Sequence, residues 1–186
     1  MTKLVAISGS LRKGSFNTAL MRAAIAMAPE GVEIVESTIR GIPLYDGDEE
    51  AVNGVPEAAA KLKDLVAAAD GVMLFTPEYN NSIPGVLKNA IDWMTRPPAD
   101  ISRVFSDKPF AIAGASPGNF GTVLSQEAWL PVMRTLRTRP WFGTKLMVSK
   151  AGSVFDGNGR IVDEATDKRL RDFVEGFVAF VRERKG

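Results

Sequence analysis

Short apolar segments alternate with helix-like patterns along this whole chain of 186 residues. Five segments have the length and composition of buried strands, at residues 4–8, 32–37, 71–76, 109–114 and 145–148. Strands that are buried on both faces of a sheet form such continuous apolar runs, and parallel neighbours need crossover connections between them. The alternation therefore predicts an α/β fold with a doubly wound, five-stranded parallel sheet in the order 2-1-3-4-5.

Five helices are expected between and after these strands, at residues 15–28, 56–69, 84–95, 119–137 and 163–184. Pro56 suits a first helical position, whereas Pro131 requires a kink or a break in the fourth helix. The last helix carries an apolar stripe that should pack on the sheet, formed by Leu170, Phe173, Val174, Phe177 and Val181. Neither a repeat nor a linker marks a boundary, so we expect one domain over residues 1–186.

The composition excludes several kinds of chemistry. The chain contains no cysteine and no histidine. Disulfides, thiol nucleophiles, thiolate or imidazole metal ligands and a Ser-His-Asp triad are therefore excluded. An enzyme of this composition would leave its difficult chemistry to a bound cofactor, and we expect no catalytic side chain and no metal site.

Net charge and hydropathy narrow the set of partners. The formal net charge is +1, so no global field favours nucleic acid or an acidic membrane surface. The N-terminus carries no signal-peptide pattern, and no apolar stretch approaches the roughly 20 residues that span a bilayer. We expect a cytoplasmic protein that does not insert into membranes.

The first strand leads into a loop rich in hydrogen-bond donors, which a helix follows. Hydroxyl, guanidinium and amide groups come from Ser10, Arg12, Ser15, Asn17 and Thr18. Backbone N–H groups and the positive end of the helix dipole favour an anion at such a place. Any one of these residues could merely cap the helix or face solvent. Together, after the first strand of such a sheet, they indicate a phosphate site.

Three kinds of phosphate loop can be compared with this segment. A dinucleotide fingerprint needs a glycine where Leu11 stands, and that side chain would obstruct the approach of a pyrophosphate. A P-loop is compatible with Gly9 and Gly14 but then fails, because Ser15 and Phe16 occupy its Lys and Ser/Thr positions. The remaining interpretation is a monophosphate held by hydroxyls, backbone amides and one guanidinium.

Two further loops should lie near this phosphate site. In the order 2-1-3-4-5 the winding reverses between the first and third strands, and ligands bind beyond the carboxyl ends of strands at such a point. In the loop at residues 77–85, Tyr79 could lie beside a planar ring while Asn80 contacts polar ring edges. Small residues at 113–119 would let a flat ligand approach the backbone. Turn formation and core packing are the alternative roles of these residues.

These loops resemble the NADPH-dependent FMN reductase family, and within it the bacterial quinone and chromate reductases. The matching segments are residues 9–17 (GSLRKGSFN) and 77–93 (PEYNNSIPGVLKNAIDW). Further similarity lies at residues 96–98 and 114–118, and the resemblance extends to about residue 155. It implies a flavodoxin-like three-layer fold, tightly bound FMN, and a homodimer or homotetramer.

The resemblance also implies roles for individual residues. The first loop would hold the FMN phosphate through Ser10, Arg12, Ser15, Asn17 and Thr18. The other two loops would contact the isoalloxazine and ribityl groups through Pro77, Glu78, Tyr79, Asn80, Ser116 and Gly118. Arg96 would lie near the flavin of a neighbouring subunit and attract anionic substrates, although a plain interface or surface role is its alternative.

The activity that the resemblance implies is reduction of a small acceptor by NADPH or NADH through FMN. We expect a ping-pong hydride transfer that requires no protein acid or base. Quinones are the expected acceptors, and chromate, azo compounds or free flavin are further ones. One alternative is a flavodoxin-like electron carrier without nicotinamide turnover, which the near-neutral charge disfavours. Another is a phosphate-binding module without flavin.

Overall fold

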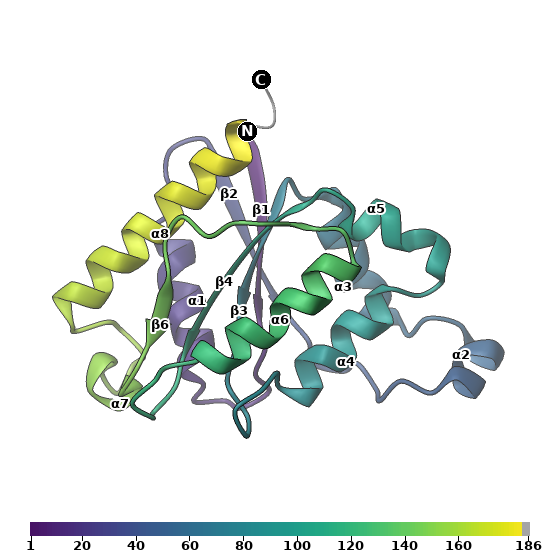
Figure 1. Cartoon of the computed structure of the whole chain (residues 1–186), viewed down its shortest axis with the longest axis horizontal. Coiled ribbons are helices and arrows are strands. Elements are labelled where there is room, and N and C mark those ends of the chain that lie inside the picture. The colour runs from purple at the N-terminus through teal and green to yellow at the C-terminus, as the bar shows by residue number, and fades with distance from the viewer. Residues whose placement is uncertain (184–186) are drawn as a thin grey trace.

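A parallel β-sheet forms the middle layer of the protein, whose structure is a computed structural model that describes residues 1–183 (Figure 1). Four strands lie in the order β2-β1-β3-β4, with bounds Val32–Thr38, Thr2–Ser8, Gly71–Phe75 and Pro109–Ala115. Each pairs with its neighbour in parallel. The predicted order is confirmed, and the winding reverses between β1 and β3.

Two short strands share the fifth position of the sheet. β5 (Arg139–Pro140) pairs with the start of β4, and β6 (Leu146–Val148) pairs with its end. Residues 141–145 leave the sheet between them, and the Trp141 ring packs against Phe173 and Phe177 of the last helix. The sequence predicted β6 but not β5, because β5 is too short to form an apolar run and its proline cannot donate a ladder hydrogen bond.

Helices cover both faces of the sheet (Figure 1). On one face, an apolar cluster joins the strands to α1 (Phe16–Ala26) and α8 (Glu164–Glu183). On the other face, a second cluster includes α3 (Glu57–Ala68), α4 (Gly85–Met94) and α6 (Val123–Thr135). The predicted apolar stripe of the last helix is buried, since its five members are at most 1% exposed. Helices therefore cover both faces of the sheet, and the loops that carry the predicted site residues lie at its carboxyl edge.

The predicted helices differ from the observed ones mainly at their ends. Pro56 is the N-cap of α3 and not its first helical residue, and Pro84 likewise precedes α4. The fourth helix begins later than expected and continues through Pro131. That proline is exposed, so water can bond the carbonyl that it leaves free. The predicted last residue of the final helix, 184, lies outside the described residues.

Four short helical segments were not predicted from the sequence. They are α2 (Gly47–Asn53), the 3-10 helix η1 (Pro98–Asp100), α5 (Ile101–Phe105) and α7 (Ala151–Val154). None is long enough to display a helical period, so the sequence could not reveal them. Within residues 1–183, no helix combines the length and the hydropathy that crossing a membrane requires.

Candidate functional site

The loops that follow β1, β3 and β4 meet at the carboxyl edge of the sheet. Gly9 packs so closely that an added Cβ would lie 2.5 Å from Leu87 Cδ2 and 3.0 Å from Pro77 Cδ. The Asn17 amide joins the first loop to the third, because it donates to the Ala115 carbonyl and accepts from the Ala115 N–H, each at 2.9 Å. The structure thus brings together the three segments in which site residues were predicted.

The start of α1 presents hydrogen-bond donors that the protein leaves unused. Ser15 is the N-cap, and its Oγ accepts from the Thr18 N–H at 3.3 Å. The N–H groups of Phe16 and Asn17 have no acceptor in the part of the chain that the structure describes. The Thr18 hydroxyl is engaged with Ser8 Oγ at 2.8 Å. Free N–H groups at the positive end of a helix form a site that a phosphate fits.

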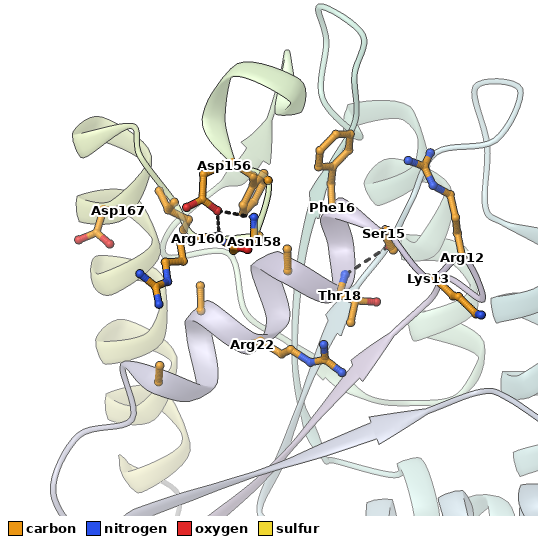
Figure 2. A pocket seen from close by; sticks show the side chains of 18 of the residues that line it. Arg12, Lys13, Ser15, Phe16, Thr18, Arg22, Asp156, Asn158, Arg160 and Asp167 are labelled. Carbon is orange, nitrogen blue, oxygen red and sulfur yellow. Dashed lines mark hydrogen bonds between the residues drawn. The ribbon is translucent and has the colours of Figure 1, made fainter.

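Two cations stand on the same loop. The Arg12 guanidinium lies 6.0 Å from the centre of the Phe16 ring, and Lys13 is exposed beside it (Figure 2). Neither has a carboxylate partner among the ion pairs of residues 1–183. Ser10 Oγ, the remaining predicted donor, accepts from the Arg12 N–H at 3.3 Å. An anion could therefore recruit Arg12 and Lys13 without breaking an existing ion pair.

A hollow of about 710 Å³ runs from this loop along α1 to the turn before α8 (Figure 2). Two charged side chains away from the loop are engaged in structural contacts. Arg22 pairs with Glu36 at 3.0 Å, and Asp156 accepts from the N–H groups of Asn158 and Arg160, each at 2.8 Å. The Arg160 guanidinium at the far end is exposed and has no carboxylate partner among the ion pairs of residues 1–183, so both ends of the hollow offer a cation to a ligand.

The loop after β3 contains a tight hairpin, in agreement with the turn role that was the alternative for its residues. Tyr79 and Ser82 exchange two backbone hydrogen bonds of 3.1 Å. Asn80 and Asn81 between them have φ values of 51° and 60°, as a two-residue turn of type I′ requires. The Asn-Asn pair was a usable signal, because asparagine tolerates this conformation. The hairpin leaves Tyr79 46% exposed, which provides an aromatic side chain beside the loops.

Glu78 serves as a cap for α6. Its Oε2 accepts from the N–H groups of Leu124 and Ser125 at 2.9 and 3.0 Å. The side chain predicted to contact a flavin therefore fixes the β3 loop to a helix. The backbone N–H groups of Glu78 and Asn80 have no acceptor among residues 1–183, and they can serve the polar edge of a ring.

The loop after β4 is held by its own hydrogen bonds. The Ser116 hydroxyl donates to the Gly121 carbonyl at 2.5 Å, and the Ser116 N–H donates to the Val148 carbonyl at 2.9 Å. Gly118 is exposed at its tip. Ser116 therefore shapes the loop, and the absence of a side chain at Gly118 keeps the backbone approachable.

Arg96 lies outside these three loops, at the end of α4. Its Nε donates to Glu50 Oε2 at 2.7 Å, and its guanidinium lies over the Tyr45 ring. Tyr45 donates its hydroxyl to the same carboxylate at 2.9 Å. Burial raises the pKa of Glu50, but the hydrogen bonds from Arg96 and Tyr45 outweigh it and leave this pKa below its ordinary value. Within one chain Arg96 is neutralised, so its role beside a neighbour's flavin stays a prediction.

One contact of the phosphate loop was not predicted at all. Arg40, just beyond β2, donates from Nη2 to the Leu11 carbonyl at 2.5 Å. The only sequence signal was the predicted strand order, which places the end of the second strand beside that of the first. From that order, a contact between the Arg40 guanidinium and the phosphate loop could have been predicted.

The donor set fits FMN at both of its ends. The phosphate would face Arg12, Ser15 and the free N–H groups that begin α1. The ring would face Tyr79 and the unbonded N–H groups of its loop. In residues 1–183, no group of acidic side chains is arranged to hold a metal ion.

Comparison with known proteins gives concordant matches. A sequence profile of NADPH-dependent FMN reductases matches residues 2–153. An NAD(P)H-dependent FMN reductase of Pseudomonas aeruginosa is 41% identical over 184 residues, which cover 99% of this chain and 97% of the relative. A 2-hydroxy-1,4-benzoquinone reductase of Burkholderia sp is 39% identical over 183 residues, or 98% of each chain. The solved structure of FerB, a flavoenzyme NAD(P)H:(acceptor) oxidoreductase from Paracoccus denitrificans, superposes with a TM-score of 0.86 at 33% identity and covers 98% of both chains.

Proposed function

This chain belongs to the NADPH-dependent FMN reductase family, and from that premise we propose that it is a cytoplasmic enzyme that uses FMN and NADPH or NADH to reduce quinones. The observation that carries this proposal is the convergence of three loops, with unbonded N–H donors and exposed Tyr79, at one edge of the sheet. FMN supplies the redox chemistry when it is bound, which suits a chain without cysteine or histidine.

The phosphate end of the site is built to hold an anion. Arg12 supplies a charge-assisted hydrogen bond, and Phe16 and Asn17 supply backbone N–H groups at the positive end of α1. Ser15 keeps the first turn of the helix in place. The side chain of Asn17 fixes this end to β4, so the distance between the phosphate and ring ends of the site is set by the fold.

The ring end of the site provides a flat and partly open surface. Tyr79 offers an exposed aromatic side chain, and Gly118 leaves the tip of the loop after β4 without a side chain. We propose that the nicotinamide and the acceptor bind this surface in turn, because planar molecules of either kind need the same stacking geometry. Chromate, azo compounds and free flavin are further acceptors for so open a surface.

Anaerobic mixing of the FMN-loaded protein with NADPH tests this function. The flavin absorbance should bleach within seconds and return when benzoquinone is added. Parallel assays with NADH, chromate, an azo dye and free FMN rank the donors and acceptors. A protein that binds FMN but keeps its absorbance with both nicotinamides would be an electron carrier, an alternative that the reductase relatives do not support.

We also propose a homodimer in which residues 43–53, termed the α2 arm, pack on a second copy of the chain. α2 has no buried residue and projects from the body of the molecule (Figure 1). Leu44 and Val52 are 82% and 81% exposed, and an isolated helix of this length has little stability of its own. Tyr45 connects the arm to α4 through a 2.9 Å hydrogen bond to Asn89.

Light scattering coupled to size-exclusion chromatography tests the oligomer. We expect the mass of a dimer, and a shift toward the monomer mass in the Leu44→Ser/Val52→Ser double variant. A tetramer that loses half its mass in this variant would place the arm at one of two interfaces. An unchanged mass would show that the arm is not an interface.

A further inference from the structure

Among residues 1–183, Arg40 is the one residue outside the tip of the phosphate loop that makes a hydrogen bond to it. It lies two residues beyond the end of β2, and its own N–H donates to Thr38 Oγ1 at 3.1 Å. Its Nη2 donates to the Leu11 carbonyl at 2.5 Å. The guanidinium therefore reaches from the second strand of the sheet to the loop that follows the first.

Little else holds this part of the loop. In the described chain, the other hydrogen bond made by residues 10–14 joins the Arg12 N–H to Ser10 Oγ, within the loop itself. Leu11 is 37% exposed, so burial anchors its side chain only partly. Without Arg40, the tip would have to be ordered when a ligand binds, and that ordering would weaken binding.

Arg40 also adds to the positive charge around the loop. Like Arg12 and Lys13, it has no carboxylate partner among residues 1–183. One of its N–H groups is engaged by the Leu11 carbonyl, and a guanidinium has others to offer. The charge therefore stays available to attract a dianion at the same loop, and salt will screen it because the residue is exposed.

We propose that Arg40 is a positioning residue that holds the loop in its phosphate-binding form and makes the site select the phosphorylated flavin over the unphosphorylated one. The inference rests on the proposed function, since it takes FMN as the ligand. Holding the loop and adding positive charge both act at the place where the phosphate binds. Riboflavin has the same ring and no phosphate, so its affinity should not depend on Arg40.

Dissociation constants of FMN and riboflavin for the flavin-free protein, measured by quenching of flavin fluorescence, test this inference. In Arg40→Met, the FMN constant should rise about tenfold and the riboflavin constant less than about twofold. Arg40→Lys keeps the charge and loses the planar fork, so we expect about threefold for FMN. Arg22→Met is the matched control, because Arg22 is exposed on α1 and paired with Glu36, and it should change neither constant.

Two further measurements separate the loop-holding effect from charge alone. The FMN constant should depend less steeply on salt in Arg40→Met than in Arg40→Lys. The effects of Arg40→Met and Arg12→Ala should be less than additive in the double variant, because a loosened loop no longer presents Arg12. Thermal unfolding of each flavin-free variant identifies loss of the fold.

Three outcomes would overturn the inference. Equal weakening of FMN and riboflavin in Arg40→Met would show a general structural role, and an unchanged FMN constant would show no role in binding. A parent protein that binds FMN normally keeps the proposed function intact in both cases. A parent protein that binds neither flavin would overturn the proposed function as well.

Discussion

The phosphate loop and the β3 loop lie at the same edge of the sheet and are built in opposite ways. The tip of the phosphate loop is exposed and is tied to the rest of the described chain by the single Arg40–Leu11 hydrogen bond. The β3 loop begins at fully buried Thr76, whose hydroxyl is bonded to Ser125 at 2.9 Å and to Trp129 Nε1 at 3.1 Å.

This difference suggests that a bound ligand orders the first loop and that contacts within the protein order the second. At the proposed phosphate end, N–H donors have no acceptor and the cations have no carboxylate partner among residues 1–183, so a bound anion would complete the structure of that loop. At the ring end, the Glu78 carboxylate and the Asn80–Asn81 turn complete it already. Affinity should therefore depend most on the phosphate loop, and the placement of the ring should depend on contacts internal to the protein.

The largest expected effect is on the phosphate loop. Arg12→Ala should weaken FMN binding by about 1.5 to 3 kcal/mol, because it removes a charge-assisted hydrogen-bonding partner. The ratio of quinone to chromate turnover at saturating FMN should stay nearly the same. Equilibrium dialysis against FMN measures the loss, with Lys13→Ala as the neighbouring control, for which we expect a smaller loss. Unchanged FMN affinity in Arg12→Ala would remove this residue from the phosphate site.

The next effect concerns the cap that joins the β3 loop to α6. Glu78→Ala leaves the N–H groups of Leu124 and Ser125 without their acceptor, which should cost about 1 to 2 kcal/mol of unfolding free energy. Because the whole loop loosens, FMN and riboflavin should weaken by the same factor, unlike in the phosphate-loop variants. Urea unfolding and flavin titration check both points, and Glu78→Gln should recover part of the loss. A loss confined to FMN would mean that Glu78 acts on the phosphate end.

The fold and the meeting of the three loops could be predicted from the sequence, whereas several contacts of the site could not. Apolar runs and their spacing reveal strands, and the switch-point rule then places residues 9–17 and 77–85 together. The cap formed by Glu78 and the bond formed by Arg40 each join segments distant in the chain. Both side chains bond to backbone groups, which almost any residue type can supply. The sequence therefore does not identify these partners, and the folded structure does.

A smaller effect is expected at the hairpin of the β3 loop. Asn81 has a positive φ of 60°, which costs a residue with a Cβ about 1 kcal/mol unless its side chain tolerates it. Asn81→Ala should therefore lower stability by about 1 kcal/mol, while Asn81→Gly should be neutral or slightly stabilising. Thermal unfolding of the two variants checks this order. Equal stability of the two would show that the turn tolerates a negative φ.

The smallest effect is expected in the α2 arm, outside both loops. The pKa of Glu50 lies below its ordinary value of 4.5, since the hydrogen bonds from Arg96 and Tyr45 outweigh the opposing effect of burial. A carboxylate whose pKa is lowered in the folded state stabilises the fold at neutral pH and loses that contribution as the pH falls through the folded-state pKa. Parent and Glu50→Gln should therefore differ in stability at pH 7 and converge in acid. Asp48→Asn, on the same arm, is the control for general charge effects. Urea unfolding between pH 7 and pH 3 measures the difference, and a gap that widened toward acid would contradict a stabilising Glu50–Arg96 pair.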